Sequence, residues 1–380
     1  FSFTHSNLEV GSPTGAVLCD LSKAFDCVDR DILLKKLELY GVIGCEGALF
    51  KSYLNERYQT VFSNGKFSEY TEVKYGVPQG SVLGPFLFLV MVNDLVSYVD
   101  TKSVMFADDA TFATSHLSVA SLQTETDNIL LQADDWYRAN MFLMNVEKTQ
   151  KIYFSLNNHY VNYDSSQCVK LLGIVLDPKL SWNPHVDLVC RKLHRVIYLL
   201  RHLKQCVPSD SLRMVYFALF HSTIAYGLLF WGNSSGTESI LISQKKAMRI
   251  LDGADPKAHC KPIFVKFKIL TVVNLYILLA LLHVKKNFSS LKLNKHVHNH
   301  DTRSSNLINK SYTRLSKIFS SYELVGISLF NKLHLSAQHV SLKHLKKTMH
   351  DWLVERPFYR LVEFYNSEIS MLTFEEIGLP

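Results

Sequence analysis

The sequence predicts an α+β fold, in which a domain of strands and packed helices is followed by a region that is almost entirely helical. Up to about residue 180, β-prone segments alternate with segments of helical periodicity, whereas long helical periodicities follow. The chain has 380 residues, of which 47% are apolar, and this is enough for two or three cores. We therefore predict domains over residues 1–180, 181–260 and 261–380, with the first boundary near Asp177-Pro178.

The first predicted elements are a strand and two helices. Ala16 to Asp20 is a short apolar strand that ends on a carboxylate. Asp29 can cap a helix over residues 30–40, whose apolar side chains have helical spacing. A second helix is expected over residues 47–55.

A hairpin and an apolar helix come next. Asn64-Gly65 is a strong signal for a tight turn, and it separates two alternating segments, residues 57–63 and 67–75. The apolar run over residues 81–98 predicts a buried helix, with Pro85 tolerated in its opening turn.

A second predicted hairpin carries two adjacent carboxylates. Residues 103–107 and 110–115 are β-prone, so Asp108 and Asp109 are expected at the tip between them. Like charges at an ordinary hairpin tip repel each other, and a bound cation would relieve that repulsion.

The remaining elements follow from periodicity. Residues 118–139 have one apolar helical face, and short strands are expected near residues 151–155 and 169–176. Further helices are predicted over residues 184–205, 209–226, 238–251 and within 263–380, with a polar, His-rich loop over residues 295–305.

Charge is distributed unevenly along the chain. Residues 1–180 carry 14 Lys and Arg against 21 Asp and Glu, a net −7, and residues 181–380 carry 27 against 13, a net +14. An acidic first half fits a metal site, and a basic second half fits a surface that holds a polyanion, because Lys and Arg displace counterions from phosphate backbones. A solvated basic face is the alternative interpretation.

Cysteine usage indicates a reducing compartment. The seven cysteines include no Cys-x-x-Cys pair, which argues against a disulfide framework and a structural zinc ribbon. Cys19, Cys27 and Cys45 are interpreted as small hydrophobic residues without chemistry. The chain opens at Phe1 and shows no secretory signal, so we expect it to be a piece of a longer protein.

Two other segments allow a functional interpretation and a simpler one. Ile269 to Leu282 is apolar but shorter than a membrane span, so a buried helix is expected. The alternating histidines of His296-Val-His298-Asn-His300 could bind a metal, but a polar loop gives them no fixed geometry.

Asp20, Asp108 and Asp109 are the candidate metal ligands. A carboxylate that ends a hydrophobic strand can face the same cleft as the tip of the second hairpin, and two Mg²⁺ ions need hard oxygen ligands. An Asp pair alone is a weak signal, because Ala133-Asp134-Asp135 repeats the tripeptide within an amphipathic helix.

Two residues near Asp20 also have simple structural interpretations. Asp26 is interpreted as a helix-start cap or packing partner rather than a third ligand. Phe25 could form an apolar wall under a sugar, or be an ordinary core aromatic.

Two loops complete the candidate site. Gly76 to Ser81 joins a strand to the apolar helix, and its glycines permit a close backbone approach to a ligand, with Gln79 facing the cleft. Lys148, within Asn145 to Thr149, could donate a proton or neutralise phosphate, although each feature also fits an ordinary surface loop.

Taken in order, these segments resemble the reverse transcriptase domain of non-LTR (LINE-type) retrotransposons, and their sequences are most similar to those of the jockey-like group. The resemblance covers about residues 15–260. Its motifs are Asp20-Leu-Ser-Lys-Ala-Phe-Asp26, Gly76-Val-Pro-Gln-Gly-Ser-Val-Leu-Gly-Pro85, Phe106-Ala-Asp-Asp109, Asn145 to Thr149, Leu171-Leu-Gly-Ile-Val-Leu-Asp177, Trp182 to His185 and Tyr226 to Gly232.

The resemblance implies a polymerase palm, an antiparallel sheet with packed helices, over residues 1–180. It further implies a helical thumb-like region over 181–260 and a helical C-terminal region over 261–380. An RNA template, a DNA primer and deoxynucleotides would be the partners, without a membrane. An intracellular location, in cytoplasm and nucleus, is expected.

The resemblance also implies roles for individual residues. Asp20 and Asp108, with Asp109 beside them, would bind two Mg²⁺ ions, with Mn²⁺ as an alternative ion. Phe25 would reject a ribose 2′-hydroxyl, and Lys148 would assist the leaving pyrophosphate. Gln79 and Gly80 belong to the implied nucleotide-binding set, and Gln79 would contact the incoming nucleotide and template.

Two departures from the family pattern stand out. Phe106 occupies a position where the family usually has Tyr, so any contact of that hydroxyl is lost. Only 19 residues precede Asp20, where the family carries a fingers subdomain that grips the triphosphate, so weak nucleotide binding is expected. An inactive remnant that only binds nucleic acid therefore remains an alternative. An RNA-dependent RNA polymerase is a third, which Phe25 disfavours.

Overall fold

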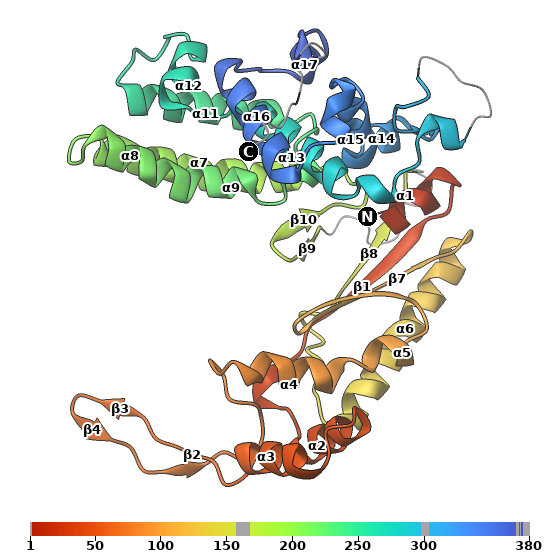
Figure 1. Ribbon diagram of the computed structural model, residues 1–380. Coiled ribbons are helices and arrows are strands. Elements are labelled where there is room, and N and C mark those ends of the chain that lie inside the picture. Colours follow the sequence, from red (N-terminus) through yellow and green to blue (C-terminus); the bar gives the residue numbers. More distant parts are fainter. Residues whose placement is uncertain (1, 157–167, 298–303, 370–371, 373, 375–380) are drawn as a thin grey trace, which may run out of the picture. The chain divides into compact units, whose positions relative to one another are not determined.

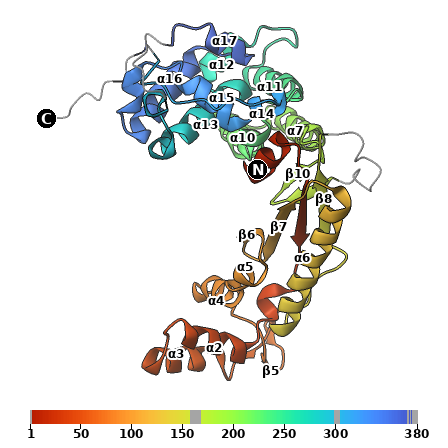
Figure 2. The same cartoon turned by 90° about the vertical axis from the view of Figure 1, so that its right-hand side faces the viewer.

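The computed structural model describes residues 2–156, 168–297, 304–369, 372 and 374 (Figures 1 and 2). The chain divides into two compact units, Phe1–Leu171 and Leu172–Pro380, which are called unit 1 and unit 2 below. Unit 1 combines a sheet with helices and unit 2 consists mainly of helices, so the predicted α+β class is confirmed.

Unit 1 is built around a four-stranded sheet. Its strands, in spatial order, are β6 (Lys102–Phe106), β7 (Asp109–Ser115), β1 (Thr14–Cys19) and β8 (Gln150–Phe154), and every neighbouring pair is antiparallel. The register pairs Thr14 with Ser115 and Cys19 with Ala110. The end of β1 therefore lies beside the start of β7.

Helix α6 (Val119–Ala139) packs against β1 and β7 (Figure 2). The predicted apolar face is confirmed, since Leu122, Ile129, Ala133 and Trp136 are all buried. The helix can approach β1 closely because Gly15 has no side chain, and a Cβ built there would lie 2.6 Å from Thr126 Cγ2.

Unit 1 has five other α-helices among its described residues. They are α1 (Ser2–Glu9), α2 (Arg30–Leu39), α3 (Gly44–Leu54), α4 (Leu83–Val92) and α5 (Leu95–Tyr98). The predicted cap is present, because Asp29 Oδ1 accepts a hydrogen bond of 2.9 Å from Ile32 N.

The sequence predicts one buried helix over residues 81–98, and this prediction is wrong. The segment forms α4 and α5, and α4 buries one face, with Leu87 and Met91 fully buried while Phe86 and Leu89 are about half exposed. Hydrophobic composition alone does not show which face meets the core.

The predicted hairpin at Asn64-Gly65 is confirmed. Strand β2 (Tyr58–Gln59) pairs with β5 (Thr71–Glu72), and β3 (Phe62–Ser63) pairs with β4 (Lys66–Phe67). Asn64 and Gly65 have positive φ angles of 50° and 77°, which suits a tight hairpin turn.

The predicted strand over residues 169–176 is interrupted. Leu172 and Gly173 have φ angles of 47° and 84° and form a turn between β9 (Val169–Leu171) and β10 (Ile174–Leu176). A continuous strand cannot contain two such residues, so the apolar pattern is shared by two short strands.

Three predicted helical segments of unit 2, over residues 184–205, 209–226 and 238–251, are helical in the structure. Residues 184–205 correspond to α7 (Asn183–Leu203), and residues 238–251 to α11 (Thr237–Asp252). Between them lie α8 (Ser209–Val215), a π-helical segment (Tyr216–His221), α9 (Ser222–Ala225) and α10 (Leu228–Trp231).

The rest of unit 2 packs around α13 (Val272–Lys286). Its other helices are α12 (Lys261–Phe267), α14 (Ser316–Phe319), α15 (Tyr322–Phe330), α16 (Leu342–Glu355) and α17 (Leu361–Tyr365), and α13 packs against α11, α15 and α16. Tyr276, Ile277 and Leu281 are almost fully buried, so the predicted buried helix is confirmed. His298 and His300 lie outside the described residues.

No single described helix is long and apolar enough to cross a membrane. Only α12 and α13 together pass that test of length and composition, as a pair bent by 58°.

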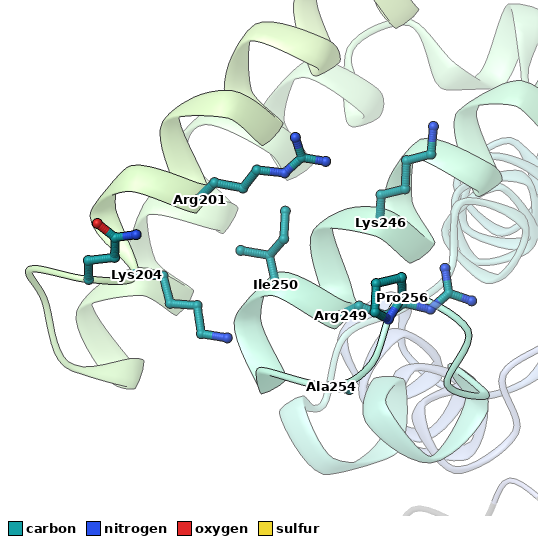
Figure 3. Close-up of a pocket in the computed structure, with 8 residues that line it drawn as sticks. Arg201, Lys204, Lys246, Arg249, Ile250, Ala254 and Pro256 are labelled. Atoms are coloured by element: carbon teal, nitrogen blue, oxygen red, sulfur yellow. The ribbon is translucent and has the colours of Figure 1, made fainter.

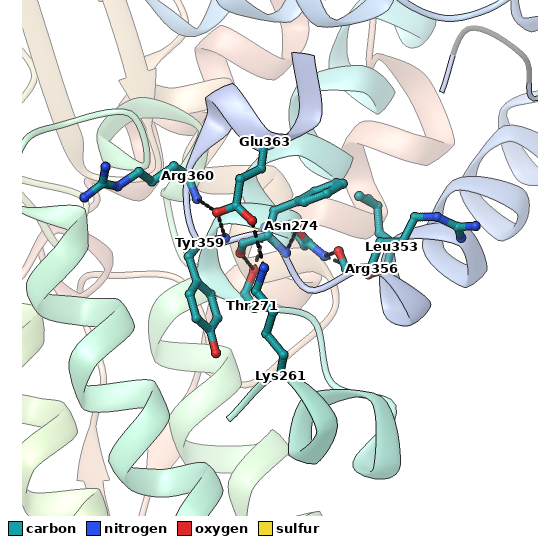
Figure 4. Close-up of polar contacts among 9 residues, drawn as sticks. Lys261, Thr271, Asn274, Leu353, Arg356, Tyr359, Arg360 and Glu363 are labelled. Atoms are coloured by element: carbon teal, nitrogen blue, oxygen red, sulfur yellow. Dashed lines mark hydrogen bonds and ion pairs between the residues drawn. The ribbon is translucent and has the colours of Figure 1, made fainter. Parts of the chain in front are cut away.

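Polar contacts at the start of α13 hold the C-terminal helices in place (Figure 4). Asn274 Nδ2 donates to Leu353 O (2.7 Å) and Arg356 O (2.9 Å), and Thr271 Oγ1 donates to Phe358 O (2.7 Å). Glu363 accepts from the backbone N–H groups of residues 359 and 360 and pairs with Lys261 at 2.9 Å. These buried and partly buried contacts tie residues 353–363 to α12 and α13.

Candidate active site

The strand register brings two of the predicted carboxylates to one edge of the sheet. Cys19, the last residue of β1, pairs with Ala110. Asp20, which follows β1, is therefore next to Asp109, the first residue of β7. Asp109 also pairs with Phe106 across the second hairpin. Asp108 lies in the turn between β6 and β7, as predicted.

Asp109 lies within the electrostatic influence of the other two carboxylates. The pKa of Asp109 is raised above its usual value, first by partial burial and then by the negative charges of Asp108 and Asp20. Neighbouring negative charges disfavour a further ionised carboxylate, which is the condition that a bound cation relieves.

Asp20 presents an acceptor without a good partner. Its Oδ2 atom is buried and accepts no hydrogen bond from any described residue. Lys148 Nζ lies 3.5 Å from this atom, within range of an ion pair but too far for a well-formed hydrogen bond. This oxygen therefore still has the capacity to accept a positively charged ligand.

Backbone hydrogen bonds place Lys148 near Asp20. Asn145 N donates to Asp20 O at 2.9 Å, and Thr149 N donates back to Asn145 O at 2.9 Å. Asn145 Oδ1 accepts from Lys148 N at 3.2 Å. The Asn145 to Thr149 turn is thus anchored on the end of β1, while the Lys148 side chain remains 69% exposed.

The hairpin tip has an unusual backbone conformation. Ala107 adopts a φ angle of 53°, in the left-handed region that costs a residue with a Cβ about 1–2 kcal/mol. Backbone outliers of this kind concentrate at functional sites.

A second group of predicted residues meets around Phe25. The Phe25 ring stacks on Phe88, with centroids 4.5 Å apart and planes 25° apart, and is only partly buried. Asp26 Oδ1 accepts a hydrogen bond of 2.7 Å from Gln79 Nε2. The exposed Asp26 carboxylate therefore holds the side chain of Gln79.

The close approach predicted for the Gly76 to Ser81 loop is made to the protein's own backbone. A Cβ at Gly76 would lie 2.9 Å from Phe25 O and from Asp26 Cα, and the residue has a φ angle of 84°. Gly80 also has a positive φ of 78°, but nothing lies within 4 Å of its Cβ position. The space beside Gly80 is open.

Arg30 is a positioning residue that the sequence does not single out. Its side chain is buried and donates to Gly76 O and Tyr75 O, each at 3.2 Å. These bonds hold the loop against the segment after Phe25. In the sequence Arg30 is merely the first residue of a helix, and no local signal distinguishes it.

The thiol beside Asp20 is not a candidate nucleophile. Burial, with a smaller contribution from the charge of Asp134, raises the pKa of Cys19 to about 12. The thiol stays protonated at neutral pH, in line with the absence of chemistry expected for it.

Asp20, Asp108 and Asp109 fit hard divalent cations through their donor chemistry. Across the described ranges, no three or more His, Cys, Asp or Glu side chains form a group that could hold a metal ion by themselves. Mg²⁺ sites of enzymes that act on nucleotides are usually completed by water and substrate phosphates, so a few carboxylates are sufficient.

Comparison with known proteins identifies the family. The family model described as reverse transcriptase (RNA-dependent DNA polymerase) matches residues 3–176. The RNA-directed DNA polymerase from mobile element jockey of Drosophila melanogaster is 30% identical over 275 residues. The probable RNA-directed DNA polymerase from transposon BS, of the same species, is 29% identical over 259 residues.

These alignments cover 63% and 62% of the chain but only 28% of each relative. Among solved structures, telomerase from Candida albicans matches with 13% identity and a TM-score of 0.36, over 70% of this chain and 49% of that one. Apo telomerase from Candida tropicalis matches with 14% identity and a TM-score of 0.39, over 70% and 47%. By its matching family model, the segment of residues 3–176 is a reverse transcriptase domain, and the relatives of the chain are RNA-directed DNA polymerases of mobile elements.

Proposed function

We propose that the chain extends a primer 3′-hydroxyl with deoxynucleotides on an RNA template. The observation that carries this proposal is that strand register brings Asp20 and Asp109 to the same end of the sheet, next to Asp108, where burial and the charges of Asp108 and Asp20 raise the pKa of Asp109. The polymerase names of the relatives support the same activity.

Asp20, Asp108 and Asp109 would hold two Mg²⁺ ions, with Mn²⁺ as an alternative. When bound, such ions stabilise the attacking and leaving oxygens of a phosphoryl transfer. The protein contributes the fixed register of β1 and β7, which keeps the carboxylates in place before the substrate arrives.

Phe25, Gln79 and Gly80 would form the nucleotide-binding side. Stacking on Phe88 restricts the ring of Phe25, so it can exclude a 2′-hydroxyl sterically. Gln79 is exposed and bonded to Asp26, and a nucleotide that binds Gln79 would compete with that bond. Gly80 leaves room for a backbone approach.

Lys148 would act on the leaving group. Its exposed ammonium lies beside Asp20 and can neutralise or protonate pyrophosphate as it departs. The net charge of +14 over residues 181–380 supports binding of the template and primer backbones.

Primer extension on an RNA template tests the proposal. We expect Mg²⁺-dependent product from the chain and a loss of about 10³-fold or more in the Asp108→Ala/Asp109→Ala variant, because metal-held charge stabilisation is worth several kcal/mol. The matched control is Asp134→Ala/Asp135→Ala, which removes the same charges from α6 and should leave product formation within about twofold.

Equal product from the chain and the Asp108→Ala/Asp109→Ala variant would contradict the proposal. Replacing deoxynucleotides with ribonucleotides in the same assay tests the role of Phe25. Efficient ribonucleotide incorporation would show that Phe25 does not act as a steric gate.

A further inference from the structure

A cavity of about 340 Å³ in unit 2 is lined by residues of α11, α13 and the segment that leads into α17. This volume lies within the range of small-ligand sites. The charged residues of its lining are two cations and one carboxylate, Lys245, Arg360 and Glu238, so the net charge of the lining is +1. The cavity lies outside residues 3–176, which the reverse transcriptase family model matches.

The charge of this cavity differs from that of the basic cavity between α7 and α11 (Figure 3). The basic cavity is lined by four cationic side chains, Arg201, Lys204, Lys246 and Arg249, with no acidic residue among its described lining residues. Figure 3 shows Arg201 and Lys204 reaching from α7 toward α11. A net charge of +1 suits a ligand with a single negative charge instead, because Glu238 would repel a polyanion.

Two tyrosine hydroxyls of the cavity lining lack partners. Tyr276 is 1% exposed, and neither its hydroxyl nor the buried hydroxyl of Tyr359 forms a hydrogen bond with any residue that the structure describes. Burial raises the pKa of both hydroxyls, that of Tyr359 to about 12, so both keep their protons at neutral pH. Buried polar groups are normally hydrogen-bonded. Both hydroxyls can therefore still donate to a ligand.

Lys245 places a partly buried cation beside one of these tyrosines. Its Nζ lies 3.6 Å from the centroid of the Tyr359 ring, and burial lowers the pKa of this ammonium. Lys261 Nζ lies 5.1 Å from the same centroid but is paired with Glu363 at 2.9 Å, and Figure 4 shows the Tyr359 ring pointing away from Glu363. Within the described ranges, Lys245 forms no ion pair. An anion in the cavity would supply its missing partner.

One face of α11 sets the order of charged and apolar groups along the cavity. Glu238, Leu241, Ile242 and Lys245 are spaced i, i+3, i+4 and i+7, so they share that face. The helical rise separates the first and last of them by about 10 Å along the axis, which keeps the carboxylate away from the ammonium. Leu241 is buried, as is Val273 of α13. Apolar surface therefore lies next to the cation.

We infer that this cavity binds a carboxylate carried on a small apolar group. Lys245 and the hydroxyls of Tyr276 and Tyr359 receive the carboxylate oxygens, and Leu241 and Val273 contact the apolar part. An acidic side chain beside an aliphatic one in a peptide offers this chemistry, and so does a free organic acid.

Calorimetric titration of the full chain with hydrocinnamate tests the site, and its neutral amide is the matched probe. We expect the acid to bind at least about tenfold more tightly than the amide, because charge-assisted hydrogen bonds are roughly twice as strong as neutral ones. Lys245→Met removes the charge and keeps an unbranched apolar stem, so it should abolish this preference. Circular dichroism checks that the variant folds.

The matched control is Lys310→Met, which removes another ammonium of unit 2, one that lies 3.7 Å from the centroid of the Phe319 ring. Its affinity for hydrocinnamate should stay within about twofold of that of the unsubstituted chain. Equal losses in the two lysine variants would overturn the inference, as would an amide that binds as tightly as the acid.

Tyr276→Phe separates a binding role of the hydroxyl from a structural one. Because the hydroxyl has no partner among the described residues, the variant should melt at the same temperature as the unsubstituted chain or higher. It should bind hydrocinnamate about threefold to tenfold more weakly. A lower melting temperature with unchanged affinity would overturn the assignment of this hydroxyl to the carboxylate.

Two competitors identify the source of the carboxylate and exclude a polyanion. If the blocked dipeptide acetyl-leucyl-glutamyl amide displaces hydrocinnamate at a lower concentration than free hexanoate does, a peptide is the source, and the opposite order indicates a free acid. Displacement by single-stranded RNA would assign the cavity to a polyanion and overturn the inference. The titration contains no template, primer or deoxynucleotide, so its result is independent of primer extension.

Discussion

The tripeptide Ala-Asp-Asp occurs twice in unit 1, at residues 107–109 and 133–135, and the two copies differ in everything but sequence. The first lies at a hairpin tip where Ala107 has a φ of 53° and where the charges of Asp108 and Asp20 help to raise the pKa of Asp109. The second lies within α6, where Ala133 is fully buried and Asp134 pairs with Arg138 at 2.7 Å.

The difference shows how the surroundings of an acidic pair set its charge balance. In α6 the negative charge is balanced by a cation one helical turn away and by water. At the hairpin tip, the charges of Asp108 and Asp20 both act on Asp109, and the Lys148 ammonium lies 3.5 Å from Asp20. Unbalanced charge, held by strand register, is what favours a metal ligand.

Removing the cation beside each acidic group should give the largest contrast. Lys148→Gln should lower kcat in primer extension by about 10²-fold, a typical loss for a positioned proton donor. Arg138→Gln removes the cation beside the second copy and should leave kcat within about twofold. Similar kcat values in the two variants would exclude a role for Lys148 in the chemical step.

Glycine substitution should affect the two copies in opposite directions. Ala133→Gly should lower the free energy of unfolding by roughly 2 kcal/mol, from lost helix propensity and a lost buried methyl group. Ala107→Gly relieves a left-handed alanine and should leave that free energy unchanged or raise it by up to about 1 kcal/mol. Urea unfolding of both variants measures the contrast, and a destabilised Ala107→Gly chain would mean that the tip is not strained.

Neutralising one carboxylate in each copy should produce the smallest effects, again of opposite sign. The pKa of Asp109 is raised in the folded state, so its ionised form costs stability at pH above that pKa, and the cost disappears as pH falls through it. Asp109→Asn should therefore stabilise the fold at pH 7, by less than about 1 kcal/mol, and this advantage should shrink on acidification.

Asp134→Asn removes an exposed i,i+4 ion pair and should destabilise the fold by about 0.3–0.5 kcal/mol at pH 7. Thermal melts of both variants between neutral and acidic pH provide the measurement. A destabilising Asp109→Asn substitution would contradict the repulsion among Asp20, Asp108 and Asp109.

Elements with a local signal were predicted well. The cap at Asp29, the turn at Asn64-Gly65 and the apolar face of α6 each depend on residues close together in the chain, and all three are confirmed. The break between α4 and α5 and the turn at Leu172-Gly173 were missed, because both lie inside apolar runs whose composition also fits one continuous element.

The candidate site was predicted as a set of residues rather than as an arrangement. The sequence identified Asp20, Asp108, Asp109 and Lys148 as candidates, but the contact between Lys148 and Asp20 depends on pairing between segments far apart in the chain. Arg30 was missed because its function is to bind the carbonyls of Tyr75 and Gly76. The basic residues of α7 and α11 were counted as net charge and not placed together.

By itself, the sequence determined the α+β class, most element positions and the resemblance that the family model confirms, because these depend on periodicity, capping and short motifs. The sequence also places Asp108-Asp109 at a hairpin tip and Asp134-Asp135 in a helix, but only the tertiary structure shows which charges surround each pair. Identical tripeptides have the same local propensities, whereas repulsion, burial and ion pairing depend on which distant residues the fold brings within a few ångströms.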